Sequence, residues 1–437
     1  MEDDNNNKQK MSISINLPDE IILEIILCLP IKSLIRFRCV NKTWLQLLTN
    51  DSQFAQLYLT KSGKNKPIFL ALRRKQEREP FSSSAVELRS DSGKLAAVPL
   101  ELPFYSNSFY KIGGIRNGLI LVSLYDDKQN LIIWNPLTND YIVIPYPPIV
   151  IPRSAHCGLI TSFGFGFIQA TNQYKVIRFC DCYEDLLHPK SHVSVYTLGV
   201  DSSWRNLKDI SYHSIVQNCT APLVNGALHW NADIYHLSFD SNILTFNMKD
   251  EIFGEIPYPK HIYASRPHTI YNLYDTVGEL DGLLCMLIRD WEENIQVWVM
   301  KEYGVTNSWT KQYTIGQPDI SGRFTFMQPI GVPQKEKTLL QIRTDTPQVI
   351  LYNPETKSIT DLKEFGLHLY AAYAYTPSLI SPRVISGDGD LLAVRHTVYT
   401  SPISPRATKE GVGVRLARRR RQKELAKKVV TRERWNV

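Results

Sequence analysis

The chain has 437 residues, of which 43% are hydrophobic and 21% charged, so it can bury a large core and a wholly disordered chain is excluded. No segment approaches the roughly 18 uninterrupted apolar residues that a membrane span needs, and the acidic, Asn-rich start lacks the form of a secretory signal. Seven cysteines without a CxxC pair argue against a disulfide framework and favour a reducing compartment.

The net charge of +7 is concentrated at one end of the chain. The segment 381–437 holds 14 Lys and Arg against 5 Asp and Glu, whereas the remainder holds 36 against 38. The main body is therefore nearly neutral, which argues against a body that binds nucleic acid.

The segment 1–15 is polar, and we expect it to be disordered. A helical pattern follows from Leu17 to Leu59. Pro18 suits the first turn of a helix, where Asp19 and Glu20 complement the helix dipole. Three later residues are suitable N-caps for further short helices: Ser33, Asn41 and Asp51.

The first of these helices is apolar on nearly every side. Ile21 and Ile25 share one face, and Ile22 and Ile26 share another. Such a helix must be buried on both sides, but a helical unit this small cannot bury both by itself. We therefore expect one face to pack on the unit's own helices and the other to bind a partner.

A β-strand pattern begins after Lys61 and recurs along the chain. Each copy has a Gly-containing turn, an apolar strand, a polar tip and a second strand that ends in an aromatic residue. The turns and first strands of three copies lie at 116–122, 224–230 and 280–285. Second strands lie at 131–139, 193–198, 243–247, 295–300 and 349–354, and a degenerate copy lies at 86–98.

The aromatic anchors of these second strands are spaced like propeller blades. Successive anchors are 62, 50, 52 and 54 residues apart, and they are Trp134, Tyr196, Phe246, Trp298 and Tyr352. A four-stranded blade takes about 40–50 residues. With an extra strand pair at 163–167 and 174–177 filling the widest interval, the spacing predicts a β-propeller-like array of about six units.

No constellation of catalytic or metal-binding residues is evident. Cys180 and Cys182 alternate on a strand ahead of His188 and His192, but a CxxC knuckle or an HxxxH helix is missing. No GxSxG motif or Cys–His pair of recognisable spacing offers a nucleophile. We therefore predict no metal site, no cofactor and no catalytic residue.

The N-terminal residues resemble the F-box of plant proteins. The resemblance rests on LPDE at 17–20, LP at 29–30, KSL at 32–34 and RFRCVNKTW at 36–44. The β region resembles the type 1, kelch-like F-box-associated domain. That resemblance rests on WNP at 134–136, GFGF at 164–167, NGALHW at 225–230, FGEIP at 253–257 and WVMKEYGV at 298–305.

The resemblance implies an α+β multidomain chain. A small helical F-box would occupy 16–60, and an all-β, β-propeller-like domain would occupy 61–382. The basic segment 383–437 is not part of the family pattern, and we expect it to be a disordered tail.

F-box proteins are substrate receptors of SCF-type (Skp–cullin–F-box) E3 ubiquitin ligases, so the resemblance implies a non-catalytic chain. Its F-box would dock on the Skp adaptor and through it on the cullin, and its β domain would bind an unidentified target protein for ubiquitination. We expect this to occur in the cytoplasm, the nucleus or both, away from membranes. The implied adaptor face comprises ten residues: Leu17, Pro18, Ile22, Ile25, Leu29, Pro30, Leu34, Cys39, Val40 and Trp44.

Other interpretations stay open from the sequence. For Leu34 and Trp44, ordinary packing inside the helical unit is an equal alternative. A β-propeller enzyme would need an acidic site in its central funnel, and a nucleic-acid-binding protein would have to work through its tail, of which 415–428 is the most basic part. Target contacts are expected on loops of one side of the propeller, and the candidate loops are 183–192, 258–268 and 316–323.

Overall fold

The structure is a computed structural model. It describes residues 17–61, 68–74, 81–88, 95–100, 102–103, 110–124, 130–147, 160–182, 190–211, 220–232, 242–259, 275–290, 292, 294–316, 326–329, 338–343, 348–361 and 369–387. The predicted disordered start and the tail from residue 388 onward lie outside the described residues.

Four helices form the N-terminal helical unit, residues 17–61. They are α1 (Asp19–Cys28), α2 (Ile31–Phe37), α3 (Lys42–Asn50) and α4 (Ser52–Lys61). The predicted caps Asn41 and Asp51 are confirmed, since their Oδ1 atoms accept the N–H groups of Trp44 and Phe54, each at 2.8 Å. The predicted cap Ser33 is wrong. Helix α2 begins at Ile31, before Ser33, and Pro30 is its N-cap. Proline is tolerated there because the N–H groups at the start of a helix have no partner within the helix, so its missing N–H costs no hydrogen bond.

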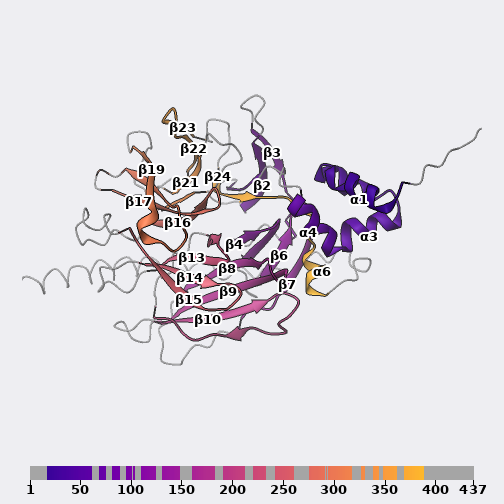
Figure 1. Ribbon diagram of the computed structural model, residues 1–437, viewed down its shortest axis with the longest axis horizontal. Coiled ribbons are helices and arrows are strands. Elements are labelled where there is room, and N and C mark those ends of the chain that lie inside the picture. Colours follow the sequence, from indigo (N-terminus) through magenta and orange to yellow (C-terminus); the bar gives the residue numbers. More distant parts are fainter. Residues whose placement is uncertain are drawn as a thin grey trace, which may run out of the picture. The chain divides into compact units, whose positions relative to one another are not determined.

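The described strands form six four-stranded antiparallel sheets, as the anchor spacing predicted (Figure 1). Sheets 1 and 2 comprise β24 (Leu369–Tyr375), β1 (Ile68–Arg74), β2 (Phe81–Leu88) and β3 (Leu95–Pro99), then β4 (Tyr110–Arg116), β5 (Leu119–Leu124), β6 (Leu131–Asn135) and β7 (Asp140–Ile144). Sheets 3 and 4 comprise β8 (Ile160–Ile168), β9 (Gln173–Cys182), β10 (Lys190–Thr197) and β11 (Arg205–Asn206), then β12 (Leu223–Val224), β13 (Ala227–Ala232), β14 (Asn242–Asn247) and β15 (Phe253–Pro257). Sheets 5 and 6 comprise β16 (Thr276–Leu280), β17 (Leu283–Arg289), β18 (Ile295–Met300) and β19 (Trp309–Ile315), then β20 (Phe326–Pro329), β21 (Thr338–Arg343), β22 (Gln348–Asn353) and β23 (Ser358–Asp361).

The six sheets close into a ring of blades. Strand β24 contacts β22 of sheet 6 and β4 of sheet 2, while β8 contacts β4 and β13, and β16 contacts β13 and β20. Sheet 1 completes the ring because the last strand of the chain, β24, pairs with the first, β1. Separate hydrophobic clusters fill the spaces between neighbouring blades. The predicted fold class is confirmed.

The predicted extra strand pair does not exist as an addition to a blade. Residues 163–167 and 174–177 belong to β8 and β9, the ordinary first and second strands of sheet 3. The five aromatic anchors all lie on the third strand of their sheet. The wide first interval therefore contains an ordinary blade, and the longer link between β7 and β8 contributes to its length.

The alternation of Gly and Phe in β8 is explained by packing on both sides. A Cβ atom on Gly164 would lie 2.7 Å from the Trp230 ring, and one on Gly166 would lie 2.5 Å from Met248. Phe163 and Phe165 join the cluster on the other side, which contains residues of sheet 2. The two glycines thus let sheet 4 approach closely.

Tight hairpins mark one side of the ring. Asn117–Gly118, Asn225–Gly226 and Asp281–Gly282 all have positive φ, between 50° and 79°, and join the first and second strands of their blades. Because strands alternate in direction, connections between third and fourth strands lie on the same side. We call this the hairpin side. Connections from second to third strands, and from one blade to the next, lie on the opposite side.

After β24 the chain runs back across sheet 2 as a strap, residues 376–387. Asn135 Nδ2 donates to the carbonyl oxygens of Ser378 at 3.0 Å and Ile380 at 2.7 Å. The strap ends in a short helix, α6 (Pro382–Ser386), and Arg383 Nε donates to the Tyr141 carbonyl at 3.2 Å. The helix begins at Pro382, where the predicted β domain ends, and its other residues lie in the segment predicted to be a disordered tail. No helix in the described ranges is long and apolar enough to span a membrane.

Candidate adaptor-binding face

Helix α1 is apolar on two faces that have different surroundings. Ile26 and Leu27 are buried in the core of the helical unit. On another face, Leu17 is 45% exposed, and Ile21 and Ile25 are each 48% exposed. Ile21 and Ile25 are four residues apart and share one face of α1, and Leu17 directly precedes Pro18, the N-cap of this helix. We call Leu17, Ile21 and Ile25 the α1 stripe.

Polar contacts join α1 to α4 and the end of α2 to α3. Tyr58 Oη donates to the Leu29 carbonyl at 2.9 Å, which fixes the end of α1 against α4. The Lys61 ammonium lies 2.6 Å from Glu24, where both side chains are largely exposed. Arg38 donates to the Leu48 carbonyl at 3.0 Å, and burial lowers the pKa of its guanidinium.

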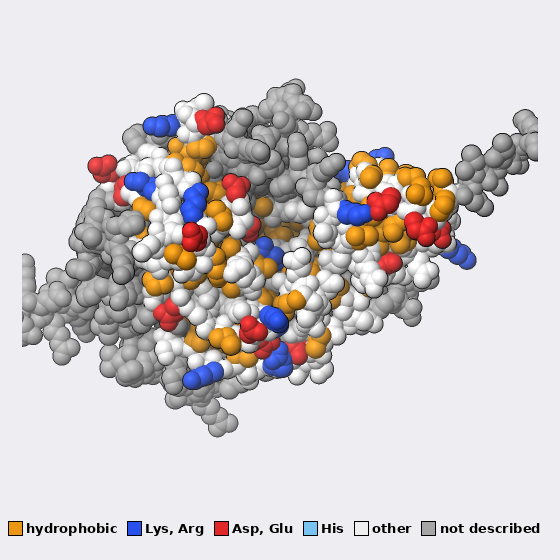
Figure 2. Space-filling model, in the orientation of Figure 1, with side chains coloured by type: hydrophobic (Ala, Val, Ile, Leu, Met, Phe, Trp, Pro, Cys, Tyr) orange, Lys and Arg blue, Asp and Glu red, His pale blue; other side chains and the backbone are white. Residues whose placement is uncertain are grey.

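A second exposed apolar group lies between α2 and α3. Val40 is 59% exposed, Cys39 is exposed, and Leu45 on α3 is 39% exposed. Below them the Trp44 ring meets Phe37 edge to face, with centroids 5.5 Å apart. Figure 2 shows hydrophobic side chains gathered over the N-terminal helices, at the right of the view, among acidic and basic ones.

The ten residues predicted for the adaptor face fall into three groups by exposure. Six are exposed: Leu17, Pro18, Ile25, Pro30, Cys39 and Val40. Three are half-buried against the helical core: Ile22, Leu29 and Trp44. Leu34 is fully buried, as expected if it packs inside the helical unit. Membership of the face stays a prediction for all ten.

Ile21 is a site candidate that the sequence interpretation left out of the face. The signal for it was present, since Ile21 lies four residues before Ile25 on one helix. Its 48% exposure places it in the α1 stripe.

The remaining face of the helical unit packs on the propeller's hairpin side. Tyr58 and Leu48 belong to the same hydrophobic cluster as Leu119, Leu198 and Tyr174 of sheets 2 and 3 and their turns. Burial raises the pKa of the Tyr174 phenol to about 12, against hydrogen bonds with Asn117 and Gln56 of α4. The helices are thus apolar on one face because they cover the propeller, which leaves the α1 stripe uncovered.

The candidate target loops lie outside the described residues for most of their length. The strand ends that carry them can still be placed. Loop 183–192 joins the second and third strands of sheet 3, and loops 258–268 and 316–323 each join one blade to the next. All three therefore start on the opposite side of the ring from the hairpins and the helical unit.

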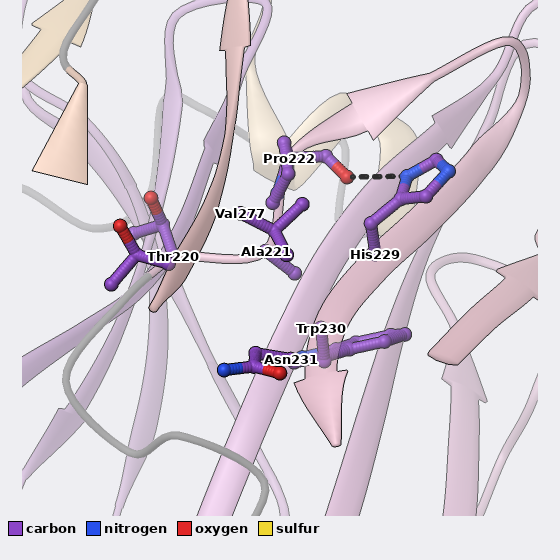
Figure 3. A pocket seen from close by; sticks show the side chains of 8 residues that line it. Thr220, Ala221, Pro222, His229, Trp230, Asn231 and Val277 are labelled. Atoms are coloured by element: carbon purple, nitrogen blue, oxygen red, sulfur yellow. Dashed lines mark hydrogen bonds between the residues drawn. The ribbon is translucent and has the colours of Figure 1, made fainter. Parts of the chain in front are cut away.

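A small pocket lies between sheets 4 and 5 (Figure 3). Its wall includes His229, whose Nδ1 is 3.3 Å from the Pro222 carbonyl and whose Nε2 is 2.9 Å from Tyr303 Oη. Asn231 Nδ2 donates to the Asp275 carbonyl at 2.8 Å and its Oδ1 accepts from Tyr258. These contacts engage His229 and Asn231 and join the two blades, whereas the buried Thr276 hydroxyl, which also lines the pocket, makes no hydrogen bond to any described residue.

The cysteine and histidine residues weighed as metal ligands are only partly described. Cys180 is buried, and His192 Nδ1 lies 2.8 Å from Asp209. His188 and the Cys182 side chain lie outside the described residues. Within the part of the chain that is described, no three His, Cys, Asp or Glu side chains gather in a way that could hold a metal ion.

Comparison with known proteins establishes the family. The F-box domain matches residues 15–55, and the F-box associated beta propeller domain matches residues 67–373. The chain is 25% identical to F-box protein CPR1 of Arabidopsis thaliana over 399 residues, which are 87% of this chain and 91% of that protein. It is also 25% identical to F-box/kelch-repeat protein At3g23880 of Arabidopsis thaliana over 393 residues, covering 84% and 96% of the two chains.

A further relative, F-box protein At3g07870 of Arabidopsis thaliana, is 29% identical over 323 residues, which are 69% of this chain and 73% of that protein. The matched ranges coincide with the N-terminal helical unit and with the ring of sheets. The chain belongs to the F-box proteins that carry an F-box-associated β-propeller domain.

Proposed function

We propose that this protein is the substrate-recognition subunit of an SCF-type E3 ubiquitin ligase, with its F-box bound to a Skp-type adaptor and through it to a cullin. F-box proteins in general act as non-catalytic adaptors, and the family assignment supports that role. The observation that carries the proposal is the α1 stripe. It is an apolar surface on the F-box, whose other apolar face already packs on the protein's own propeller.

The α1 stripe is large enough to contribute to binding. Full burial of a Leu or Ile side chain is worth about 1.5–3 kcal/mol, and each stripe residue is roughly half exposed. Completing the burial of all three would then contribute about 3 kcal/mol. Val40 and Leu45 can add to this if the adaptor also covers the turn between α2 and α3.

The two ends of the protein would have separate tasks. The F-box packs on the hairpin side of the propeller, and the candidate target loops start on the opposite side. A target bound there would be held at a fixed distance from the ligase, which raises the local concentration of its lysines near the ubiquitin-transfer centre. The chain itself would supply no reacting group. We expect this assembly in the cytoplasm, the nucleus or both.

The test is co-purification of the full chain with a plant Skp-type adaptor and a cullin. The wild type should form a ternary complex on gel filtration. The double variant Leu17→Ala/Pro18→Ala should leave the propeller folded, as judged by its thermal midpoint, but should lose the adaptor. A folded wild type that binds no adaptor would refute the proposal.

A further inference from the structure

The strap, residues 376–387, is buried as deeply as the core, although it lies beyond the ring of blades. The ring is complete at Tyr375, where β24 ends, and the family's propeller domain matches only as far as residue 373. Residues 378–381 are nevertheless each at most 5% exposed. Four successive residues outside a helix point their side chains in different directions. A segment with nothing above it would leave some of them exposed, so the strap is covered from both sides.

One side of the strap is fixed to the hairpin side of sheet 2. Ser378 Oγ donates to the Asn117 carbonyl at 2.6 Å, in the first hairpin of that sheet, and Asn135 donates to two carbonyl oxygens of the strap. Arg383 Nε donates to the Tyr141 carbonyl, and its guanidinium carbon lies 5.6 Å from the centroid of the Tyr141 ring. These contacts account for the position of the strap on sheet 2, but not for the burial of its apolar side chains.

The apolar side chains of the strap pack in the cluster that the F-box shares with the propeller. Leu379 and Ile380 belong to this cluster, and Ile385 of α6 packs against it. The F-box contributes Leu48 of α3 and Phe54 of α4 to the same cluster. Together with the burial of residues 378–381, this shared cluster indicates that the F-box is the second cover of the strap.

The turn of sheet 2 that the strap holds also faces the F-box. Asp140 follows this turn, directly before Tyr141, and its Oδ2 atom is buried without a hydrogen-bond partner among the described residues. The Nε atom of Arg38, at the end of α2, is buried in the same state. The Asp140 carboxylate opposes the lowering of the Arg38 pKa by burial, so the two charges are close enough to interact. The F-box therefore meets sheet 2 at the same turn to which the strap is tied.

We propose that the strap positions the F-box on the propeller, so that a segment beyond the family's β domain sets the orientation of the two domains. The ring does not need the strap for closure, because β24 pairs with β1 before the strap begins. The α1 stripe does not need it for adaptor binding, because the stripe is exposed on another face of α1. The strap therefore acts on orientation. That this orientation sets the distance from the adaptor to the target rests on the proposed receptor function.

The test measures hydrogen exchange and X-ray scattering of the full chain. In Leu379→Ala/Ile380→Ala, the backbone amides of α3 and α4 should exchange at least about tenfold faster than in the wild type, while those of sheets 4 and 5 stay unchanged. The radius of gyration should increase, because the helical unit separates from the ring. The matched control is Val349→Ala/Ile350→Ala, which truncates two adjacent buried residues of sheet 6 and should leave α3 and α4 unchanged. Exchange in α3 and α4 that is unchanged in the strap variant, or equally fast in both variants, overturns the proposal.

A second pair of variants tests the far end of the strap and decides the matter if the first pair does not fold. A Cβ atom on Gly199 would clash with the Ile385 carbonyl oxygen, whereas one on Gly304, in the corresponding turn of sheet 5, would meet nothing within 4 Å. Both glycines have positive φ, 71° and 80°, so alanine strains both turns alike. Gly199→Ala should speed exchange in α3 and α4 and Gly304→Ala should not, and equal exchange in the two overturns the proposal. Adaptor affinity should equal that of the wild type in every variant, so failure of this inference and failure of the receptor role are distinguishable.

Discussion

His229 is buried between sheets 4 and 5, and burial lowers the pKa of its imidazole to about 4. The unfolded chain has a His pKa of about 6.5 and so takes up the proton first as the pH falls. The stability that depends on neutral His229 is therefore complete above pH 6.5 and is lost as the pH falls towards 4.

This predicts a pH-dependent free energy of unfolding. Between pH 7.5 and 4.5, His229 should account for a decrease of about 2–3 kcal/mol. Urea titrations at the two pH values would measure it, with His229→Gln as the comparison, since glutamine can keep a hydrogen bond to Tyr303 but does not titrate. If the variant loses as much stability as the wild type over this range, His229 is not the titrating group.

Glu251 joins sheets 3 and 4 on the hairpin side. Its Oε1 is 2.6 Å from Lys175 Nζ and 2.7 Å from Arg205 Nη2, and these partners lower its pKa to about 2. The Lys175 side chain is only 5% exposed and also donates to the Met248 carbonyl at 2.8 Å. Removing the carboxylate would leave that ammonium buried without its counter-ion.

We therefore expect Glu251→Gln to lower the free energy of unfolding by about 2–3 kcal/mol. The control is Asp209→Asn, which breaks the contact with His192, where both side chains are well exposed and the cost should be below about 1 kcal/mol. Denaturant unfolding of both variants gives the comparison. Equal costs would show that burial of Lys175 does not determine the effect.

For single residues, the sequence predicts a role only where a local pattern marks the residue. The shared face of Ile21 and Ile25 follows from their spacing of four residues, and the caps Asn41 and Asp51 follow from their positions before apolar runs. The buried position of Arg178 could not be found in this way. This arginine, on β9, has its guanidinium carbon 5.5 Å from the centroid of the Tyr146 ring, which belongs to another blade and is 32 positions away in the chain.

The blade hairpins are the elements that the sequence predicts best. Asn-Gly and Asp-Gly occupy positions where both residues need positive φ, and the structure places them there. Closure of the ring is different, because β24 pairs with β1 across the whole propeller. Its sequence, LYAAYAY, lacks the turn and the anchor that mark the other blades.

Gly118 and Gly226 occupy the same position in two of these hairpins, with φ of 79° and 74°. A Cβ on Gly118 would lie 2.8 Å from the backbone nitrogen of Ser378 in the strap, whereas one on Gly226 would meet nothing within 4 Å. Gly226→Ala should therefore cost only the backbone strain, about 1–2 kcal/mol. Gly118→Ala should cost at least about 1 kcal/mol more, because the strap must also move. Thermal unfolding of the two variants measures the difference, and equal midpoints would mean that the strap does not press on the hairpin.

Asn135 and Asn353 form a second matched pair. Each Oδ1 accepts the N–H two residues later at 2.9 Å, which closes the turn between the third and fourth strands. Only Asn135 also donates to the strap, at Ser378 and Ile380. Asn353→Ala should cost about 1 kcal/mol and Asn135→Ala about 3 kcal/mol, since two buried carbonyls lose their donor. Chemical denaturation measures both, and a similar cost for the two would contradict a holding role for the strap.

At the scale of the whole molecule, the division into an F-box and a propeller could be predicted from the chain, and so could the number of blades. The side of the propeller that the F-box covers could not. It depends on the shared cluster of Tyr58, Leu198 and Tyr174, which combines residues from three separate regions. That packing decides which apolar face of α1 is free for a partner.

The most direct test of the central claim is the affinity of the full chain for a Skp-type adaptor, measured by isothermal titration with two matched variants. Ile25→Asp places a charge in the α1 stripe, and Ile252→Asp places one on a propeller residue that is 64% exposed. We predict binding by the wild type, a loss of about 100-fold for Ile25→Asp and no change for Ile252→Asp. Absence of binding by a folded wild type, or an equal loss in both variants, would contradict the account.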